Sequence, residues 1–294
     1  MPNLIESHLA LLPESTGRAT ATLQPRLFHY TTLQGFLGIV GSKMMWATNI
    51  HYLNDSEEFV YGLGYLKTEA ETRAKDASAG HQAVLLRVAS LVDYFKQGYV
   101  YTASFAEDDD LLSQWRGYGV GGGLCLGFLV RDLQKIAERS GFRLIKCIYE
   151  QSQKAALAKE FIDHSLTAID ATTALGNERV EELANQIVTR YQQLACAFKD
   201  PSFREECEWR IISKFVPVDH ESVKVRGTAT MLVPYFEVDL DLGQDDRGRT
   251  NIGIDTLIAG PSLQKERILQ AASIATKHLT IEASRPSEIP YRSL

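Results

Sequence analysis

Two carboxylates and an arginine lie close together in the segment Glu206-Cys207-Glu208-Trp209-Arg210. The segment alternates like a strand, which places Glu206, Glu208 and Arg210 on one face and Cys207 and Trp209 on the other. A carboxylate held there can stabilise positive charge at a sugar carbon that loses its leaving group. Because Arg210 can also pair with one of the acids, an edge strand carrying a solvated ion pair is the structural alternative.

A histidine near the start of the chain is the second candidate for chemistry. His29 lies in the segment LFHYTT, between apolar neighbours and directly before a predicted helix. A histidine there can orient a ligand, although a lone histidine on a strand is more often structural. Tyr30 alternates to the other face of the strand, so the two share a pocket only if the strand ends there.

An aromatic and basic segment lies at residues 113–118, SQWRGY, beside several glycines. Arg116 can clamp a phosphate, and Trp115 and Tyr118 can stack on a planar base. The acidic residues 108–110 can equally begin a helix in which Trp115 belongs to the core. Both interpretations stay open.

Two further motifs lack the context that their chemistry needs. Residues 117–122 have the spacing GxGxxG of a dinucleotide-binding fingerprint, but they precede a predicted strand, whereas such a fingerprint follows a strand and opens a helix. Helix capping explains the segment NDSEE at 54–58. A metal site built from His51, Asp55 and Glu58 has no hydrolase spacing, so we predict no metal.

The composition is that of an ordinary soluble globular protein. Of 294 residues, 45% are hydrophobic and 23% are charged, and the net charge of −6 provides no overall positive field for nucleic acid or an anionic membrane. No 18-residue apolar run is present, and the N-terminus lacks the basic region of a signal peptide. The four cysteines lack zinc-site spacing. We therefore expect a cytoplasmic protein with free thiols and no membrane partner.

The hydrophobic pattern predicts clustered strands with helices inserted between them, which favours the α+β class over a doubly wound fold. Strands are expected at 27–30, 44–48, 99–106, 122–129, 142–149, 206–215, 222–225, 231–239, 252–258 and 279–282. Helices are expected at 3–12, 31–41 with Thr31 as its cap, 59–76, 81–96 and 263–276, and in most of 151–200. The predicted organisation is an N-terminal helix and linker over 1–25 and a single α+β domain over 26–294, with helical insertions at about 55–97 and 151–200.

An ordered set of motifs resembles a bacterial family of unknown function whose members are similar to the ADP-ribosyltransferase superfamily. The motifs are LFHYTT, WATNIHYLNDSEEF, YTASF, LLSQWRGYGVGGGLCLGF, EECEWRII and SEIPYR, and they extend from about residue 26 to 293. The resemblance implies an ADP-ribosyltransferase-like split β-sheet core with inserted helices. It also implies NAD as the cosubstrate.

The resemblance further implies a site. Glu208 is implied as the catalytic carboxylate, and Glu206 as the earlier glutamate of an ExE pattern, which helps to activate the acceptor. The residues implied to bind NAD lie on three segments: His29, Tyr30, Thr31, Tyr101, Ser104, Phe105, Trp115, Arg116 and Tyr118. In the implied reaction nicotinamide leaves, Glu208 stabilises the oxocarbenium-like ribose, His29 orients the adenine-side ribose, and Arg116 holds the pyrophosphate.

The resulting hypothesis is an NAD-dependent ADP-ribosyltransferase, such as a toxin or phage-defence effector, that modifies a protein, a nucleic acid or a small molecule. Two alternatives stay open. One is an NAD glycohydrolase, in which water replaces the acceptor. The other is a non-catalytic module that binds or senses a nucleotide.

Overall fold

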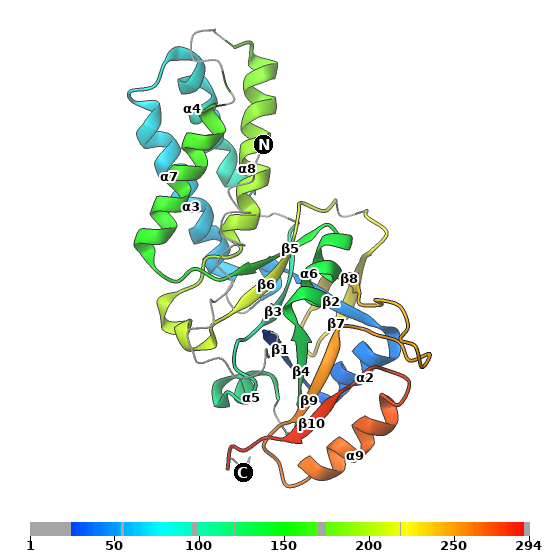
Figure 1. Cartoon of the computed structure of the whole chain (residues 1–294). Helices are drawn as coiled ribbons and strands as arrows, with labels where there is room; N and C mark the ends of the chain where they lie inside the picture. Colours follow the sequence, from blue (N-terminus) through cyan, green and yellow to red (C-terminus); the bar gives the residue numbers. More distant parts are fainter. Residues whose placement is uncertain are drawn as a thin grey trace, which may run out of the picture.

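The protein has a mixed α+β fold in which two open β-sheets lie at one end of a bundle of four long helices (Figure 1). The computed structural model describes residues 25–53, 56–95, 99–119, 121–167, 169, 175–217 and 219–290. The α+β class expected from the sequence is therefore confirmed. No helix in these ranges is long and apolar enough to cross a membrane.

The larger sheet has six strands in the order β5-β6-β3-β2-β8-β7, and the smaller has four in the order β1-β4-β9-β10. The strands of the larger sheet are β5 (Phe142–Lys146), β6 (Trp209–Ser213), β3 (Tyr101–Phe105), β2 (Met44–Asn49), β8 (Leu232–Asp239) and β7 (Val223–Gly227). Those of the smaller sheet are β1 (Arg26–Thr31), β4 (Leu124–Leu129), β9 (Ile254–Ala259) and β10 (Ala283–Pro286). All neighbouring strands are antiparallel except β9 and β10.

The two sheets meet where β1 passes the end of β3. The amide of Phe28 donates to the carbonyl of Ala106 at 2.9 Å, and the amide of Ala106 donates back to Phe28 at 2.8 Å. An apolar core that includes Phe105, Phe128 and Trp209 fills the space between the sheets. This junction brings β1, β3 and the start of β6 close together, although they are distant in sequence.

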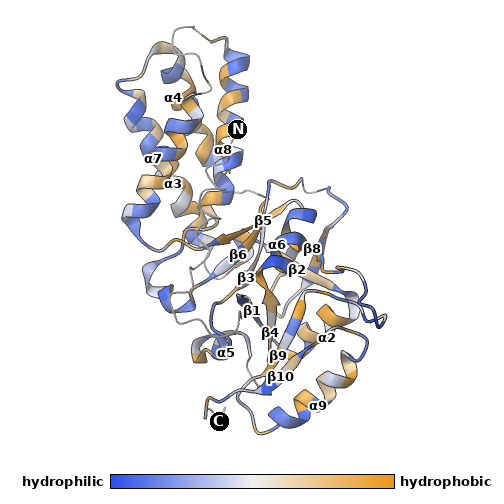
Figure 2. Ribbon diagram, viewed as in Figure 1, coloured by the Kyte–Doolittle hydropathy of each residue, from blue (hydrophilic) through white to orange (hydrophobic). Residues whose placement is uncertain are grey.

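One end of the helix bundle packs against β5 and β6 of the larger sheet (Figure 1). Its helices are α3 (Ser56–Ala74), α4 (Ala79–Phe95), α7 (Gln151–Thr167) and α8 (Asn177–Ala195), and their inward faces share a core with Ile145 of β5 and Ile212 of β6. Apolar and polar positions alternate along these helices as this packing requires (Figure 2). Gly62 permits the close approach of α3 to α8, because a Cβ atom there would lie 2.9 Å from the Ala195 carbonyl oxygen.

Most expected elements are present, with several differences. Thr32, and not Thr31, caps α2 (Leu33–Ser42), because its hydroxyl accepts from the amide of Gly35 at 3.0 Å. Residues 201–206 form a 3-10 helix, η2 (Pro201–Glu206), and the last strand lies at Ala283–Pro286 and not at 279–282. The sequence also gave no expectation of α6 (Val130–Arg139), which follows β4 directly. The expected helix at 3–12 lies outside the described residues, as do Asn54 and Asp55.

The two remaining helices cover the smaller sheet. The short helix α5 (Leu112–Tyr118) contacts β1, and α9 (Lys265–Ala275) contacts β9 and β10. The GxGxxG segment begins in the last turn of α5 and leads the chain into β4, with Gly121 and Gly122 at φ 80° and 109°. It is therefore a turn, as the sequence context indicated, because residues other than glycine rarely adopt these angles.

Candidate functional site

Ser104 on β3 connects two of the residues predicted from the sequence. Its carbonyl oxygen lies 2.9 Å from Nδ1 of His29 on β1. Its side chain lies close enough to the Glu208 carboxylate, which directly precedes β6, to help lower the pKa of that group. Three segments of the predicted site therefore meet at one serine of the sheet junction.

His29 and Glu208 approach Ser104 from different sides. Side chains alternate along β3, so Ala103 and Phe105 face the core between the sheets, and Ser104 faces the helix bundle. The His29 ring lies 5.7 Å from the ring of Phe105. Glu208 lies on the Ser104 side, so the backbone of β3 separates the imidazole from the carboxylate.

Glu208 belongs to a buried cluster of opposite charges. Arg210 donates from Nε to Oε1 of Glu208 at 2.7 Å and from Nη2 to Oε2 at 3.0 Å. Lys199 donates from Nζ to Oε2 of Glu208 at 2.9 Å and to Oε2 of Glu206 at 3.1 Å. Glu208, Arg210 and Lys199 are each at most 5% exposed.

The cluster keeps Glu208 ionised despite its burial. Burial is the strongest influence and by itself raises the pKa of the carboxyl group, but the charges of Arg210 and Lys199 and hydrogen bonds from Arg210 and Ser104 outweigh it. The pKa of Glu208 therefore lies below its ordinary value of 4.5. For His29, burial lowers the pKa below 6.5, although the hydrogen bond to Ser104 acts in the opposite direction. At neutral pH the site thus holds an anionic glutamate and a neutral histidine.

The ion pair between Glu208 and Arg210 agrees with the structural alternative that the sequence offered, but its setting differs. The strand begins only at Trp209, and β6 lies between β5 and β3 and not at an edge. Glu206 ends η2, and Cys207 has a left-handed backbone with φ 40°. Strand alternation therefore does not bring Glu206 and Glu208 together; Lys199 does so by binding both.

Lys199 and Lys154 are two cations of this region that the sequence analysis did not identify. Lys154 of α7 is buried, and its Nζ donates to the carbonyl of Lys199 at 2.7 Å. Lys199 ends the segment LACAFK at 194–199, a lysine after five mainly apolar residues. A lysine in such a context indicates a buried cation, which needs a carboxylate partner.

Trp115 and Tyr30 belong to a second cluster on the far side of β1. Trp115 is 2% exposed, and its indole nitrogen donates to Asp110 at 2.7 Å. Its ring lies 4.7 Å from that of Tyr30, whose hydroxyl donates to the Asp108 carbonyl at 2.9 Å. Glycines at 119 and 260 press against the indole, where a Cβ atom would lie within 2.8 Å of it. The core interpretation of Trp115 is therefore confirmed, and stacking on a ligand would require the cluster to open.

The other predicted cofactor-binding residues do not gather at Ser104. Tyr101 and Phe105 are buried in the core between the sheets. Thr31 is half-buried at the end of β1, next to α2. Arg116 and Tyr118 lie on the exposed surface of α5.

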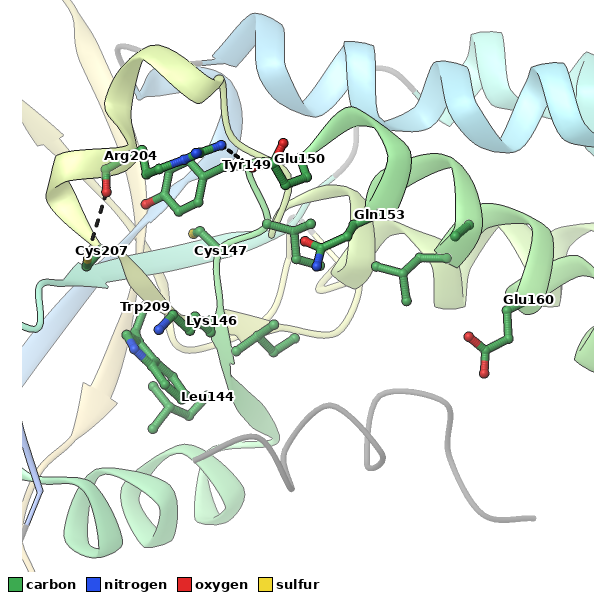
Figure 3. A pocket seen from close by; sticks show the side chains of 14 residues that line it. Leu144, Lys146, Cys147, Tyr149, Glu150, Gln153, Glu160, Arg204, Cys207 and Trp209 are labelled. Carbon is green, nitrogen blue, oxygen red and sulfur yellow. Dashed lines mark hydrogen bonds and ion pairs between the residues drawn. The ribbon is translucent and has the colours of Figure 1, made fainter. Parts of the chain in front are cut away.

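A cavity of about 730 Å³ lies beside the Glu208 segment, at the end of β5 (Figure 3). Its lining includes Cys147, Tyr149, Arg204, Cys207 and Trp209 and the first turns of α7. Glu208 is not among its lining residues, because its carboxylate faces the bundle. Only its backbone adjoins the cavity wall, through an amide that donates to the Tyr149 hydroxyl at 2.9 Å.

The cavity differs from the buried cluster in the chemistry of its surface. Arg204 pairs with Glu150 across the opening, and the Cys207 thiol lies 3.5 Å from the Arg204 carbonyl (Figure 3). Burial, and then the nearby Glu107, raise the pKa of Cys207, so this thiol is not activated as a nucleophile. Within the described ranges no group of three His, Cys, Asp or Glu side chains could hold a metal ion.

Residues 114–211 match a protein family described only as a protein of unknown function, DUF2971. The matched region runs from α5 to β6 and includes Glu208, but it contains neither His29 nor Ser104. Comparisons with curated proteins and with solved structures gave no match.

Proposed function

We propose that the protein is an NAD-dependent ADP-ribosyltransferase whose site lies around Ser104, at the junction of an ADP-ribosyltransferase-like split sheet. The observation that supports the proposal is the position of Ser104, whose carbonyl lies 2.9 Å from the His29 ring and whose side chain lies close enough to Glu208 to help lower the pKa of its carboxyl group. These are the three positions that the resemblance implies, and they come from separate segments of the chain.

Glu208 supplies the main chemical contribution in this proposal. The bond between the ribose C1′ atom and nicotinamide breaks, and its electron pair leaves with neutral nicotinamide. The positive charge that develops on the ribose is stabilised by the buried Glu208 carboxylate, and groups of this kind are typically worth about 3 to 4 kcal/mol in a reaction barrier. The acceptor then forms the new bond to C1′ and passes its proton to Glu206.

The proposal requires a rearrangement at Glu208. A carboxylate has about four acceptor positions, and donors from Arg210, Lys199 and Ser104 occupy them in the free protein. A ribose hydroxyl must therefore replace one of these donors. The proposed site is one that opens when NAD binds.

A non-catalytic nucleotide-binding module is the second candidate, and the same saturation of Glu208 favours it. A carboxylate whose acceptor positions are all filled is explained by its role in holding β6 against the helix bundle. In that case NAD or another nucleotide would bind without turnover. The two candidates differ in one measurable quantity, the release of nicotinamide.

The test compares the wild-type protein with Glu208→Gln and with Glu160→Gln, whose exposed side chain lies on α7. Each protein is incubated with NAD labelled in the adenylate and with cell lysate, and both free nicotinamide and transferred label are measured. The proposal expects transfer in the wild type and in Glu160→Gln and a loss of at least tenfold in Glu208→Gln.

Other outcomes identify the alternatives. Nicotinamide release without transfer indicates a glycohydrolase, and NAD binding without release indicates the binding module. Equal transfer by the wild type and Glu208→Gln contradicts the role given to Glu208. Circular dichroism spectra verify that each variant is folded.

A further inference from the structure

Lys199 occupies a place in the site that neither the sequence motifs nor the proposed chemistry assigns. We propose that Lys199 is the positioning residue of the site: it holds the Glu208 carboxylate in the free protein, and it moves onto Glu206 when a ribose hydroxyl takes its place on Glu208. This inference rests on the proposed function. It names the donor that leaves when the site opens.

The contacts of Lys199 support an exchange between the two acids. Its ammonium group lies 2.9 Å from Oε2 of Glu208 and 3.1 Å from Oε2 of Glu206. A small movement therefore breaks one contact while the other persists. The charge stays paired throughout, which is essential for a side chain that is only 6% exposed.

The backbone of Lys199 is fixed, so the exchange is confined to the side chain. Its amide donates to the Ile148 carbonyl at 3.0 Å, and its carbonyl accepts from Nζ of Lys154 at 2.7 Å. The ammonium group also lies 4.8 Å from the centre of the Phe203 ring, which favours a cation at this position. An anchored backbone with two alternative acceptors is what a positioning residue needs.

Arg210 is a poorer choice for the donor that leaves. Its guanidinium binds both oxygens of Glu208, and its Nη1 donates to the Cys196 carbonyl at 2.8 Å. Its displacement breaks both bonds to Glu208 and distorts the bond to the Cys196 carbonyl. Lysine carries a compact charge on a flexible stem and gives up one bond. The departure of Lys199 also leaves Glu208 with one cation in place of two, which strengthens its attraction for a positive ribose.

The experiment uses three variants of the full chain. Lys199→Met removes the charge, Lys199→Arg keeps it, and Lys159→Met removes an exposed lysine of α7 that does not bind Glu206 or Glu208. Glutamate carboxyl groups are labelled with ¹³C and titrated by NMR, and the signals are assigned with Glu206→Gln and Glu208→Gln. The pH profile of NAD turnover is measured on the same proteins.

The expected result is specific to the charge at position 199. An opposite charge at this range typically shifts a carboxyl pKa by about 1 to 3 units, so Lys199→Met should raise the pKa of Glu208 by about 1 unit because Arg210 remains. The acid limb of the turnover profile should move to higher pH by the same amount. Lys199→Arg should restore most of both quantities, and Lys159→Met should move neither.

Failure of this inference and failure of the proposed function give different results. Unchanged carboxyl titrations in Lys199→Met, or an equal shift in Lys159→Met, overturn the role of Lys199. A shifted titration with an unshifted turnover profile also overturns it. A wild-type protein that does not bind NAD contradicts the proposed function and the exchange step together. If Lys199→Met does not fold, Lys199→Arg and Lys159→Met are compared, and a profile moved only by Lys159→Met overturns the inference.

Discussion

The cluster around Trp115 and the cluster around Glu208 contain similar residue types, and both include residues that the sequence offered for ligand binding. They differ in how their polar groups are satisfied. Asp110 accepts from the indole of Trp115, from the Ser287 hydroxyl and from the Glu288 amide, so α5 and the C-terminal segment are both bound to one carboxylate. Each of these three donors has one acceptor. The arrangement fixes the C-terminal segment against α5.

The Glu208 cluster instead shares its donors between acceptors. Lys199 binds two carboxylates, and Arg210 binds a carboxylate and a backbone carbonyl. A network with shared donors has a second arrangement close to the first. In the Trp115 cluster the donors from Trp115, Ser287 and Glu288 each have one acceptor, although the half-exposed Arg285 lies between Asp109, at 2.7 Å, and Asp110, at 4.0 Å. A candidate site therefore differs from a structural anchor in having polar groups with alternative partners, and not in residue type or burial.

The largest loss of unfolding free energy is expected from removing a charge in the Glu208 cluster. Arg210→Met leaves Glu208 buried with one cation, and breaking a buried pair in this way typically costs about 3 to 5 kcal/mol of unfolding free energy. Urea denaturation measures it, with Arg267→Met as the control because Arg267 is exposed on α9. An effect no larger than that of the control would show that the charges of the cluster are not important for folding.

A smaller loss of unfolding free energy is expected from a substitution in the Trp115 cluster. Asp110→Ala removes the shared acceptor and leaves the donors of Trp115 and Ser287 unsatisfied, which typically costs about 1 to 3 kcal/mol. Thermal denaturation measures this loss. NAD affinity should not change, because the contacts of Asp110 hold structure only. A weaker affinity for NAD would indicate that the Trp115 cluster contributes to NAD binding.

Strand positions were predictable from the sequence, but side-chain partners were not. The apolar alternation near His29 and Ser104 located β1 and β3, because buried strands carry a strong local pattern. The helix α6 was missed because the chain passes from β4 into it at Leu129 with no turn residue and no side-chain cap. The 3-10 helix η2 did have a local signal, since Asp200 caps it and Pro201 begins it.

The candidate site was only partly predictable for a different reason. Glu208, Ser104 and His29 were singled out by the resemblance, and the structure brings them into contact through Ser104. Lys199 was not predicted as a site residue because its role depends on where α8 ends relative to β6, which is a tertiary property. Trp115 was ambiguous because an aromatic residue beside an arginine and a glycine serves a core and a ligand equally well.

The smallest expected effect concerns pH, and it separates His29 from Glu208. Burial lowers the pKa of His29 below the unfolded value of 6.5, so the unfolded chain binds a proton that the folded protein excludes. Stability is therefore complete above pH 6.5 and declines as the pH falls below it. The pKa of Glu208 is also lowered, from 4.5, so its contribution is complete above pH 4.5 and is lost as the pH falls through its folded value.

His29→Gln tests this separation, because the glutamine amide can still donate to the Ser104 carbonyl but cannot titrate. Urea denaturation between pH 7.5 and about 4 should show a smaller decline beginning near pH 6.5 in the variant, while the one beginning near pH 4.5 remains. Part of the decline near pH 6.5 stays, because burial also lowers the pKa of His51. His164→Gln is the matched control, since His164 is exposed on α7. A decline that is unchanged in His29→Gln, or reduced in His164→Gln, would contradict its assignment to His29. A decline reduced only in His29→Gln would show that the folded protein holds the His29 imidazole neutral where the unfolded chain binds a proton.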